Sequence, residues 1–389
     1  MNYKEAYDIC LKKAKLYRDT ISGELPEITG ADGKEYKATG TFASRWCWCT
    51  SFFTGMSVLA AHTEKDFQAL RWANSFFDQY EEKISKIPAA TMHDVGFLYL
   101  CYSVHLYMLT GDVHHRLTAL KAADELVRRF DINGRYIEAW SDADSFDKEY
   151  RMIIDSMMNT ALLFWAWKDS GYTIYYDVAK AHIRTCIDTL VREDYSVAHA
   201  WFFNPDGTLK EEANSCGFAN GSHWARGTAW IVFGLATAYA YTKDEEYYEL
   251  AVKIADKFLE NLTEDDYIPV WDFRLPEDLP ARKMRREDAE PTWDESKPEN
   301  KIYNRDSSAA AIISCGFMIL NEAKATPHLM EAADKMLKSL CDSYLDTDVT
   351  TQGMLKKGNG IDKFVIYGDY YFMLAMAMKN YGFDMWNCN

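Results

Sequence analysis

Helical segments of two kinds alternate along this chain, and this alternation constrains its fold more than any other feature of the sequence. Segments of the first kind place apolar residues at helical spacing on one face, with an alanine near the middle and aromatic residues around it. They are centred on Ala73, Ala122, Ala179, Ala251 and Ala332. Most of them follow turn or capping residues that are typical of a helix start. Each is therefore expected to be a helix with one face buried and the other in water.

Segments of the second kind are apolar nearly all round, which is typical of helices that are buried on most sides. They cover residues 51–62, 95–109, 155–167, 223–241, 307–320 and 368–378. With an opening helix over 2–18, twelve helices are predicted, and strand signals are confined to short connecting stretches such as RYIEAW and AHAWFF. The alternation predicts an all-α fold of six hairpins closed into a double ring, the (α/α)6 toroid. The alternatives are an irregular all-α domain and an open solenoid.

A toroid places its binding site at one mouth, where loops meet the ends of the inner helices. The long connections predicted at 131–152, 195–222, 262–304 and 345–367 are expected to build that mouth. None of them has the composition of a linker, so residues 1–389 are expected to form a single domain.

Charge and cysteine content narrow the possible partners and compartments. The formal net charge of −16 argues against a nucleic acid or an anionic membrane as partner, although local cations can still hold an anionic small substrate. No apolar run reaches the ~18 residues of a membrane span, and the opening MNYKEAYDIC does not resemble a secretory signal. The nine cysteines lack metal-binding spacing and are expected to be free thiols in a reducing compartment. A cytoplasmic protein without a metal is therefore predicted, and its oligomeric state stays open.

Two aspartates stand at the predicted starts of neighbouring inner helices. Asp94 follows His93 in MHDVGFLYL, and Asp155 lies among isoleucines and methionines in RMIIDSMMN. The helix N-terminus favours the ionised carboxylate, whereas burial favours the neutral acid and can raise its pKa by up to about 3–5 units. Paired carboxyl groups suit glycoside chemistry, and a neutral Asp155 is a candidate proton donor. The alternatives are that Asp94 merely caps its helix and that the spacing arises by chance among 59 acidic residues.

Arg226 and Trp230 are four residues apart in HWARGTAW and share one face of a predicted helix. Arginine binds carboxylates through two hydrogen bonds, and a tryptophan ring offers a platform for the apolar face of a sugar. The alternative is a buried pair between Arg226 and an aspartate, with Trp230 filling the core. Further candidates are Trp48, Trp140 and His199, although single residues of these types are more often structural.

Five segments, taken in order, resemble a known family. They are WxxxFFTGM from Trp48, HDVGFLY from His93, RMIIDSMMN around Asp155, WARGTAW around Arg226 and IYGDYYF ending at Phe372. The ordered set is similar to the unsaturated glucuronyl hydrolases of glycoside hydrolase family 88 and spans most of the chain. This resemblance implies the (α/α)6 barrel independently of the helix pattern.

The resemblance also implies roles for individual residues. Asp155 matches the family's catalytic acid/base, and Asp94 matches its second, substrate-contacting aspartate. The positions that line the family's sugar pocket correspond to Trp48, His93, Trp140, His199, Arg226 and Trp230. The family usually carries a His-Gln pair where this chain reads Ser215-Cys216, which leaves substrate preference and part of the acid/base support open.

The implied substrate is an oligosaccharide left by a polysaccharide lyase, ending in a 4,5-unsaturated uronic acid. Protonation at C4 of its vinyl ether creates an oxocarbenium-like centre at C5, water adds there, and the hemiketal opens and releases the remaining saccharide. One carboxyl group can donate the proton and then take one from water, so no cofactor is expected. The alternatives are a rhamnogalacturonyl hydrolase, another toroid glycosidase, a sugar 2-epimerase that uses His93 and His199, and a non-catalytic glycan-binding protein. The polysaccharide upstream stays open.

Overall fold

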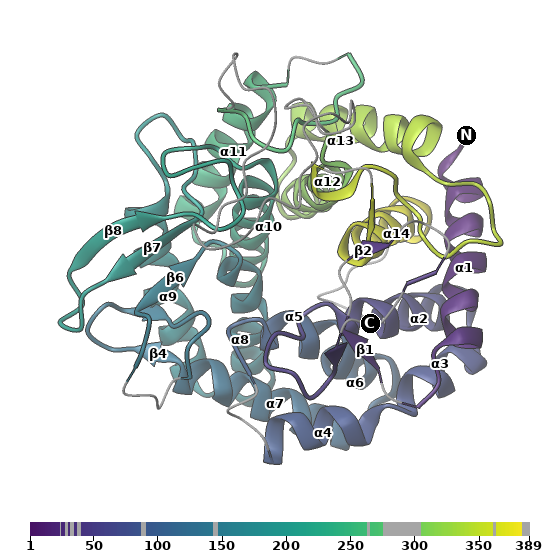
Figure 1. Cartoon of the computed structure of the whole chain (residues 1–389), viewed down its shortest axis with the longest axis horizontal. Coiled ribbons are helices and arrows are strands. Elements are labelled where there is room, and N and C mark those ends of the chain that lie inside the picture. Colours follow the sequence, from purple (N-terminus) through teal and green to yellow (C-terminus); the bar gives the residue numbers. More distant parts are fainter. Residues whose placement is uncertain are drawn as a thin grey trace.

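The computed structural model describes residues 1–23, 25–27, 30–31, 35–36, 40–86, 91–142, 147–262, 265–274, 305–360 and 363–382. Helices follow one another around a closed double ring in this part of the chain (Figure 1). The predicted connection 262–304 falls mostly outside the described residues.

The inner ring consists of the helices that were predicted to be buried on most sides. They are α2 Thr50–Glu64, α5 Val95–Tyr99 with the π-helical turn Leu100–Val104 and α6 His105–Thr110, α8 Ser156–Ser170, α10 Ala225–Thr242, α12 Ser307–Ala323 and α14 Ile366–Tyr381. Each packs against the next in this order, and α14 packs back against α2, which closes the ring. The predicted (α/α)6 toroid is therefore confirmed, and an open solenoid is excluded.

The outer ring consists of amphipathic helices that cover the inner ones. They are α1 Tyr3–Thr20, α3 Phe67–Asn74 with α4 Phe77–Lys86, α7 Val113–Arg128, α9 Thr173–Leu190, α11 Glu245–Glu260 and α13 Pro327–Ser339. The five alanines at the predicted segment centres are all buried, which is where a small side chain allows two helices to approach closely. One predicted outer helix is divided into α3 and α4, because the hydroxyl of Ser75 donates to the carbonyl of Trp72 and the last turn of α3 tightens.

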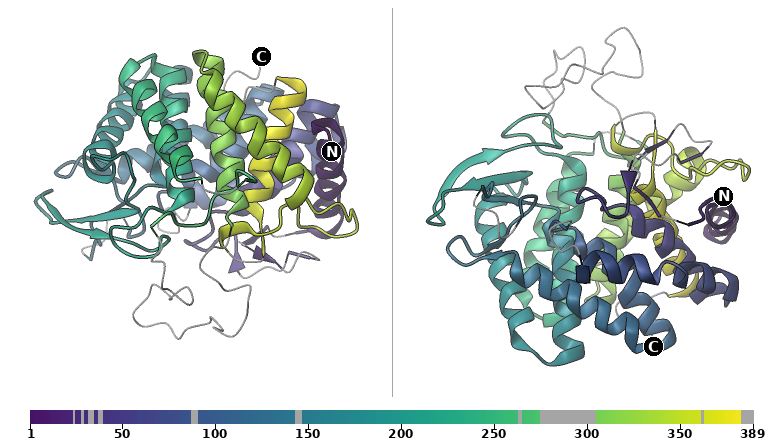
Figure 2. Two further views of the ribbon diagram at one scale, coloured as in Figure 1. Left: turned by 90° about the horizontal axis from the view of Figure 1, so that it is seen from above. Right: turned by 60° about the horizontal axis from the view of Figure 1, so that its bottom comes forward.

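Connections at the two ends of the toroid differ in length. After most inner helices the chain enters the next outer helix within two residues, and Gly111 and Gly171 supply the left-handed backbone that this turn requires. Asp66, Asp112 and Asp244 then cap the outer helices by accepting backbone N–H groups. The long connections therefore precede the inner helices, and their described parts gather with the strands at one end of the ring, at the lower end of the left panel of Figure 2.

Short strands stiffen this end. β6 Arg151–Ile153, β7 Ala200–Phe203 and β8 Leu209–Ala213 form an antiparallel sheet at the left of Figure 1, with Arg151 opposite Phe202 and Ile153 opposite Ala200. The other pairs are β1 Pro26–Glu27 with β3 Gly40–Thr41, β2 Gly30–Ala31 with β9 Phe364–Val365, and β4 Phe130–Asp131 with β5 Tyr136–Ile137. RYIEAW and AHAWFF therefore contain strands within connections, as predicted.

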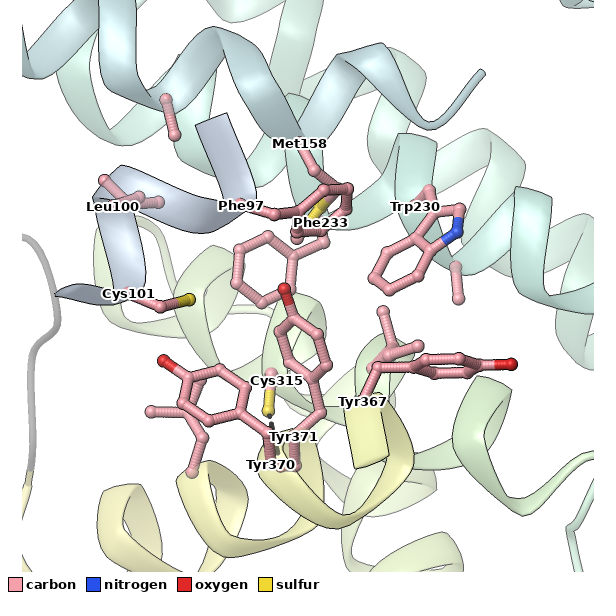
Figure 3. Packing of buried hydrophobic residues seen from close by; sticks show 14 of the residues in the cluster. Phe97, Leu100, Cys101, Met158, Trp230, Phe233, Cys315, Tyr367, Tyr370 and Tyr371 are labelled. Atoms are coloured by element: carbon pink, nitrogen blue, oxygen red, sulfur yellow. Dashed lines mark hydrogen bonds between the residues drawn. The ribbon is translucent and has the colours of Figure 1, made fainter. Parts of the chain in front are cut away.

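The main hydrophobic core extends from Ala6 to Ala377, and a small second cluster contains Ala139, Ile153, Ala200 and Ala213. The centre of the main core is rich in aromatic rings, and Figure 3 shows Phe97, Trp230 and Tyr371 facing one another there. Eight cysteines in the described segments are free thiols, in line with the prediction from their spacing. Within the described residues, no helix combines the length and the apolar composition that crossing a bilayer would require.

Candidate active site

Backbone hydrogen bonds join distant loops into one frame at the mouth of the toroid. The N–H of His93 donates to the carbonyl of Ala139, and the N–H of Ala139 donates to the carbonyl of Arg151, both at 2.9 Å. Directly after β6, the N–H of Ile154 donates to the carbonyl of His199 at 2.9 Å. Residues that are far apart in the sequence are thereby fixed around the start of α8.

Asp94 and Asp155 occupy the N-cap positions of α5 and α8, yet neither side chain accepts a hydrogen bond from its own helix. The carboxylate of Asp94 instead accepts a hydrogen bond from Nδ2 of Asn159 at 3.1 Å. The alternative that Asp94 serves as a helix cap is therefore wrong. Both carboxyl groups lie at the same mouth and are available for other interactions.

Asn159 holds the starts of the two helices together from one turn inside α8. Its Oδ1 accepts the backbone N–H of Phe97 at 2.8 Å, so its Nδ2 must be the atom that faces Asp94. The same Nδ2 also approaches the carbonyl of Asp155 at 3.4 Å. A Cβ atom on Gly96 would lie 2.4 Å from Cα of Asn159, so only glycine permits this close contact.

Burial shifts the proton equilibria of both carboxyl groups. It raises the pKa of Asp94 to about 8, and the negative charge of Asp155 adds to that rise. Burial also raises the pKa of Asp155 to about 6, against the opposing effects of His199 and Arg226. Two such groups share about one proton near neutral pH. The side chain of Asp155 is 18% exposed and that of Asp94 is 8% exposed, so Asp155 is the one more open to a ligand.

Two histidines flank the carboxyl pair. Nδ1 of His199 accepts the backbone N–H of Ser215 at 3.0 Å, so the ring proton of His199 is on Nε2, which lies 3.9 Å from Oδ2 of Asp155. His93 is buried with its Nε2 3.5 Å from Oδ2 of Asp94. Burial, reinforced by the charge of Arg129, holds the pKa of His93 well below its usual value and keeps that ring neutral.

Aromatic and cationic groups continue from His199 around the mouth in an arc. The ring of His199 meets Trp224 edge-on at 5.2 Å, and the guanidinium of Arg226 lies 4.5 Å from the centre of the Trp224 ring. The same guanidinium is 5.1 Å from the ring of Tyr367, which in turn stacks on Trp48 at 5.1 Å. The arc thus joins three of the predicted residues, Trp48, His199 and Arg226, to Asp155.

The guanidinium of Arg226 is already paired with a carboxylate. Its Nη1 donates to Oδ2 of Asp306 at 2.6 Å, and Asp306 also accepts the backbone N–H groups of Ala309 and Asn359. The alternative of a buried arginine–aspartate pair is thus confirmed for Arg226. Its further role toward a substrate carboxylate stays a prediction.

The two remaining candidates differ in position. Trp140 directly follows Ala139 of the backbone frame, is partly buried, and stacks with the guanidinium of Arg151 at 4.5 Å. Trp230 has an exposed fraction of 0% and packs among Phe97 and Tyr371 in the core (Figure 3). Its ring therefore offers no free face to a sugar in this structure, as the core-filling alternative expected.

Several residues of the site carry no role in the sequence interpretation: Asn159, Trp224, Asp306 and Tyr367. Asn159 had a usable signal, because it stands four residues after Asp155 and so shares its helix face. Asp306 precedes an apolar helix, which indicates a helix cap. Its pairing with Arg226 could not be predicted from the sequence, because the two residues are 80 positions apart and no local pattern links them. Cys216, at the position that departs from the family pattern, is partly exposed and directly follows Ser215, whose backbone N–H donates to Nδ1 of His199.

Comparison with known proteins identifies the family. No model of a known protein family matches the chain. It is 31% identical over 347 residues to an unsaturated chondroitin disaccharide hydrolase of Streptococcus pneumoniae, covering 85% of this chain and 81% of that protein. It is 30% identical to the unsaturated glucuronyl hydrolase of Bacillus sp. strain GL1, covering 86% of each chain.

Solved structures agree. The crystal structure of the unsaturated glucuronyl hydrolase from Bacillus sp. GL1 superimposes with a TM-score of 0.84 at 27% identity, covering 98% of this chain and 97% of that one. A Streptococcus agalactiae unsaturated glucuronyl hydrolase superimposes with a TM-score of 0.85 at 26% identity, covering 99% of this chain and 93% of that one. With the toroid and the carboxyl pair in place, these likenesses show that the chain belongs to the family of the unsaturated glucuronyl hydrolases.

Proposed function

We propose that this enzyme hydrates the C4=C5 double bond of a 4,5-unsaturated uronic acid at the non-reducing end of an oligosaccharide. In this reaction Asp155 is the acid/base. The observation that carries the assignment is Oδ2 of Asp155, which is buried at the mouth without a hydrogen-bonding partner in the described structure. A buried oxygen of this kind is costly unless a ligand uses it. Its raised pKa keeps a protonated fraction available close to neutral pH.

The reaction is balanced by one water molecule. Asp155 gives its proton to C4, and the positive charge that develops is shared between C5 and the ring oxygen. Water then adds to C5 and returns a proton to the carboxylate of Asp155. The resulting hemiketal opens to a C5 ketone, and the hemiacetal left at C1 expels the rest of the saccharide as an alcohol and becomes an aldehyde. The carboxyl group ends in its starting state.

Neighbouring residues divide the remaining tasks. The Nε2–H of His199 faces the oxygen of Asp155 that exchanges the proton and stabilises its ionised form after the transfer. Asp94, neutral at pH 7 and oriented by Asn159, is positioned to donate a hydrogen bond to the sugar. Trp48 and Trp140 supply the sides of the sugar site, and Arg226 adds positive potential for the uronate carboxylate. His93 is buried and adjoins Asp94, with its Nε2 3.5 Å from Oδ2 of that carboxyl group.

The substrate class is supported by what related proteins bind. A Streptococcus agalactiae enzyme with TM-score 0.77 and 25% identity was solved with dGlcA-GalNAc6S. Another related structure, with a TM-score of 0.83 and 26% sequence identity, was solved with dGlcA-Glc-Rha-Glc. The unsaturated residue is common to both ligands, whereas the attached saccharide differs. We therefore assign an unsaturated glucuronyl residue to the carboxyl pair and leave the identity of the leaving saccharide to assay.

The test uses a panel of lyase-made unsaturated disaccharides, whose ultraviolet absorbance disappears when the double bond is hydrated. We expect turnover by the wild type, none by Asp155→Asn, and wild-type rates for Asp177→Asn on the exposed face of α9. Circular dichroism confirms that all three proteins are folded. Activity retained by Asp155→Asn removes that residue from the role. Hydrolysis of saturated glycosides indicates an ordinary glycosidase, and tight binding without turnover indicates a glycan-binding protein.

A further inference from the structure

Trp46 exposes half of a large apolar ring at the same mouth and takes no part in the site described above. Its side chain is 51% exposed, and it stands on the connection before α2, two residues ahead of Trp48. A single exposed hydrophobic residue is ordinary in a soluble protein, so exposure alone assigns it no role. What distinguishes Trp46 is the backbone segment that holds it and the ring of Trp140 beside it.

The segment that carries Trp46 is held firmly from below. Lys83 of α4 is buried and donates from Nζ to the carbonyls of Phe42 and Ser44 at 2.8 and 2.9 Å. The ammonium group also lies 5.2 Å from the centre of the Phe42 ring. The hydroxyl of Ser44 in turn accepts the backbone N–H of Trp46 at 3.2 Å. The buried ammonium group of Lys83 thus fixes the backbone of this segment, and the exposed ring of Trp46 is carried on a well-held backbone.

The exposed ring of Trp46 stands beside a ring already assigned to the sugar site. The Trp46 and Trp140 rings meet at 6.0 Å with an interplanar angle of 74°. Arg45 ties the two segments together by donating from Nη1 to the carbonyl of Trp140 at 3.5 Å. Behind Trp140, the guanidinium of Arg151 is sandwiched at 4.5 Å from that ring and 4.4 Å from Phe202. The two tryptophans therefore form a braced corner.

We propose that Trp46 and Trp140 form an outer subsite for the pyranose ring of the leaving saccharide. The inference rests on the proposed function. Because the unsaturated residue is the end of its chain, an oligosaccharide bound at the carboxyl pair can extend in one direction only. Ala139 contacts His93 through its backbone, so Trp140 lies next to the carboxyl pair and Trp46 lies one ring farther out.

The chemistry of the corner fits a sugar. A pyranose ring presents C–H groups on its faces, which pack against an aromatic ring, and hydroxyl groups on its edge, which stay in water. The half of the Trp46 ring that is free of protein supplies such a face, and the ring of Trp140 closes the second side. Two more strongly exposed rings, Phe67 and Tyr172, stand at the short connections on the opposite end of the toroid and have no part in this corner.

The experiment compares substrates that have or lack the second ring. We measure kcat/KM for the methyl glycoside of the unsaturated uronic acid, for an unsaturated disaccharide and for an unsaturated tetrasaccharide. Trp46→Ala should lower kcat/KM for the disaccharide and tetrasaccharide by about tenfold, the loss expected when one apolar ring contact disappears. The methyl glycoside should react at the wild-type rate. Trp46→Phe should recover part of the loss, and Phe67→Ala, a matched exposed aromatic residue, should change nothing.

The outcomes separate the two proposals. If the wild type hydrates none of the three substrates, the proposed function fails. If the wild type is active and Trp46→Ala retains wild-type kcat/KM on all three, the outer subsite is refuted. Equal losses on all three substrates also refute it, because they mean that Trp46 supports the site as a whole and contacts no leaving saccharide.

Discussion

Nε2 of His199 lies 3.9 Å from Oδ2 of Asp155, an oxygen that otherwise lacks a hydrogen-bonding partner in the described part of the protein. The distance is too long for a hydrogen bond but short enough for a strong electrostatic effect. His199 accordingly lowers the pKa of Asp155, while burial raises it to about 6. The imidazole therefore limits how strongly the carboxyl group holds its proton.

This relationship predicts the pH dependence of the reaction. Asp155 must be protonated to donate, so kcat/KM should fall as pH rises through about 6. His199→Phe removes the proton on Nε2 and should raise the pKa of Asp155. The falling limb of the profile of kcat/KM against pH should then move to higher pH by roughly half a unit or more. The measurement is kcat/KM against pH for both proteins. His328→Phe, at an exposed histidine paired with Asp256, should leave the limb in place. A limb that stays put or moves to lower pH in His199→Phe contradicts the assignment.

Asp94 is expected to reduce the stability of the fold. Its pKa is raised from 3.8 to about 8 in the native protein, so between these values the native state binds more protons than the unfolded state. Stability contributed at this position is therefore lost as pH rises through that window. Asp94→Asn removes the cost of keeping this buried acid protonated, which the ionised aspartate of the unfolded chain does not bear, while its amide oxygen can still accept the hydrogen bond from Asn159.

We expect Asp94→Asn to raise the free energy of unfolding by up to about 5 kcal/mol at pH 7.5, at about 1.36 kcal/mol for each pH unit above 3.8, and to change it little at pH 4. Urea denaturation at the two pH values measures the difference. Asp177→Asn on the exposed face of α9 provides the comparison for a carboxylate that stays in water. Destabilisation of Asp94→Asn by the same amount at both pH values would show that packing, and not ionisation, dominates at this position.

The periodicity of the sequence was sufficient to predict the toroid, because helices apolar on all faces must lie inside and one-sided helices must cover them. The same reasoning placed Asp94 and Asp155 at neighbouring helix starts. It did not predict the π-helical turn Leu100–Val104 or the break between α3 and α4, which depend on single hydrogen bonds and local packing. These features change no apolar pattern, so a pattern cannot reveal them.

The candidate site shows where local spacing stops being informative. Arg226 and Trp230 share a helix face, as the i, i+4 rule requires, yet that face is covered at Trp230 by α14 and α5 and paired at Arg226 with Asp306. What covers a residue depends on elements brought near by ring closure. The residue most easily recovered from spacing alone is Asn159, one turn beyond Asp155.

Gly96 tests whether the junction between α5 and α8 controls the site. Because an added Cβ would meet the backbone of Asn159 at 2.4 Å, Gly96→Ala must push the two helix starts apart. We expect a loss of about 3 kcal/mol in stability together with a fall in kcat, since Asn159 and Asp94 move with the junction. The control is Gly171→Ala, where the space is open and the left-handed φ of 77° should cost only about 1 kcal/mol. Equal effects of the two substitutions would show that the junction adapts without strain.

Cys216 offers a chemical probe of the site. It is the one cysteine in the described segments that is not buried, and it directly follows Ser215, whose backbone N–H donates to Nδ1 of His199 beside Asp155. Alkylation with N-ethylmaleimide should therefore place a bulky group beside the carboxyl pair and abolish activity at a rate that a bound unsaturated disaccharide slows. The measurement pairs the rate of inactivation with mass spectrometry of the labelled peptide, in a Cys388→Ser background because Cys388 lies outside the described residues. Cys216→Ser should keep its activity in the presence of the reagent. Inactivation of that variant at the wild-type rate would show that Cys216 does not adjoin the reacting groups, because a thiol elsewhere would then be responsible.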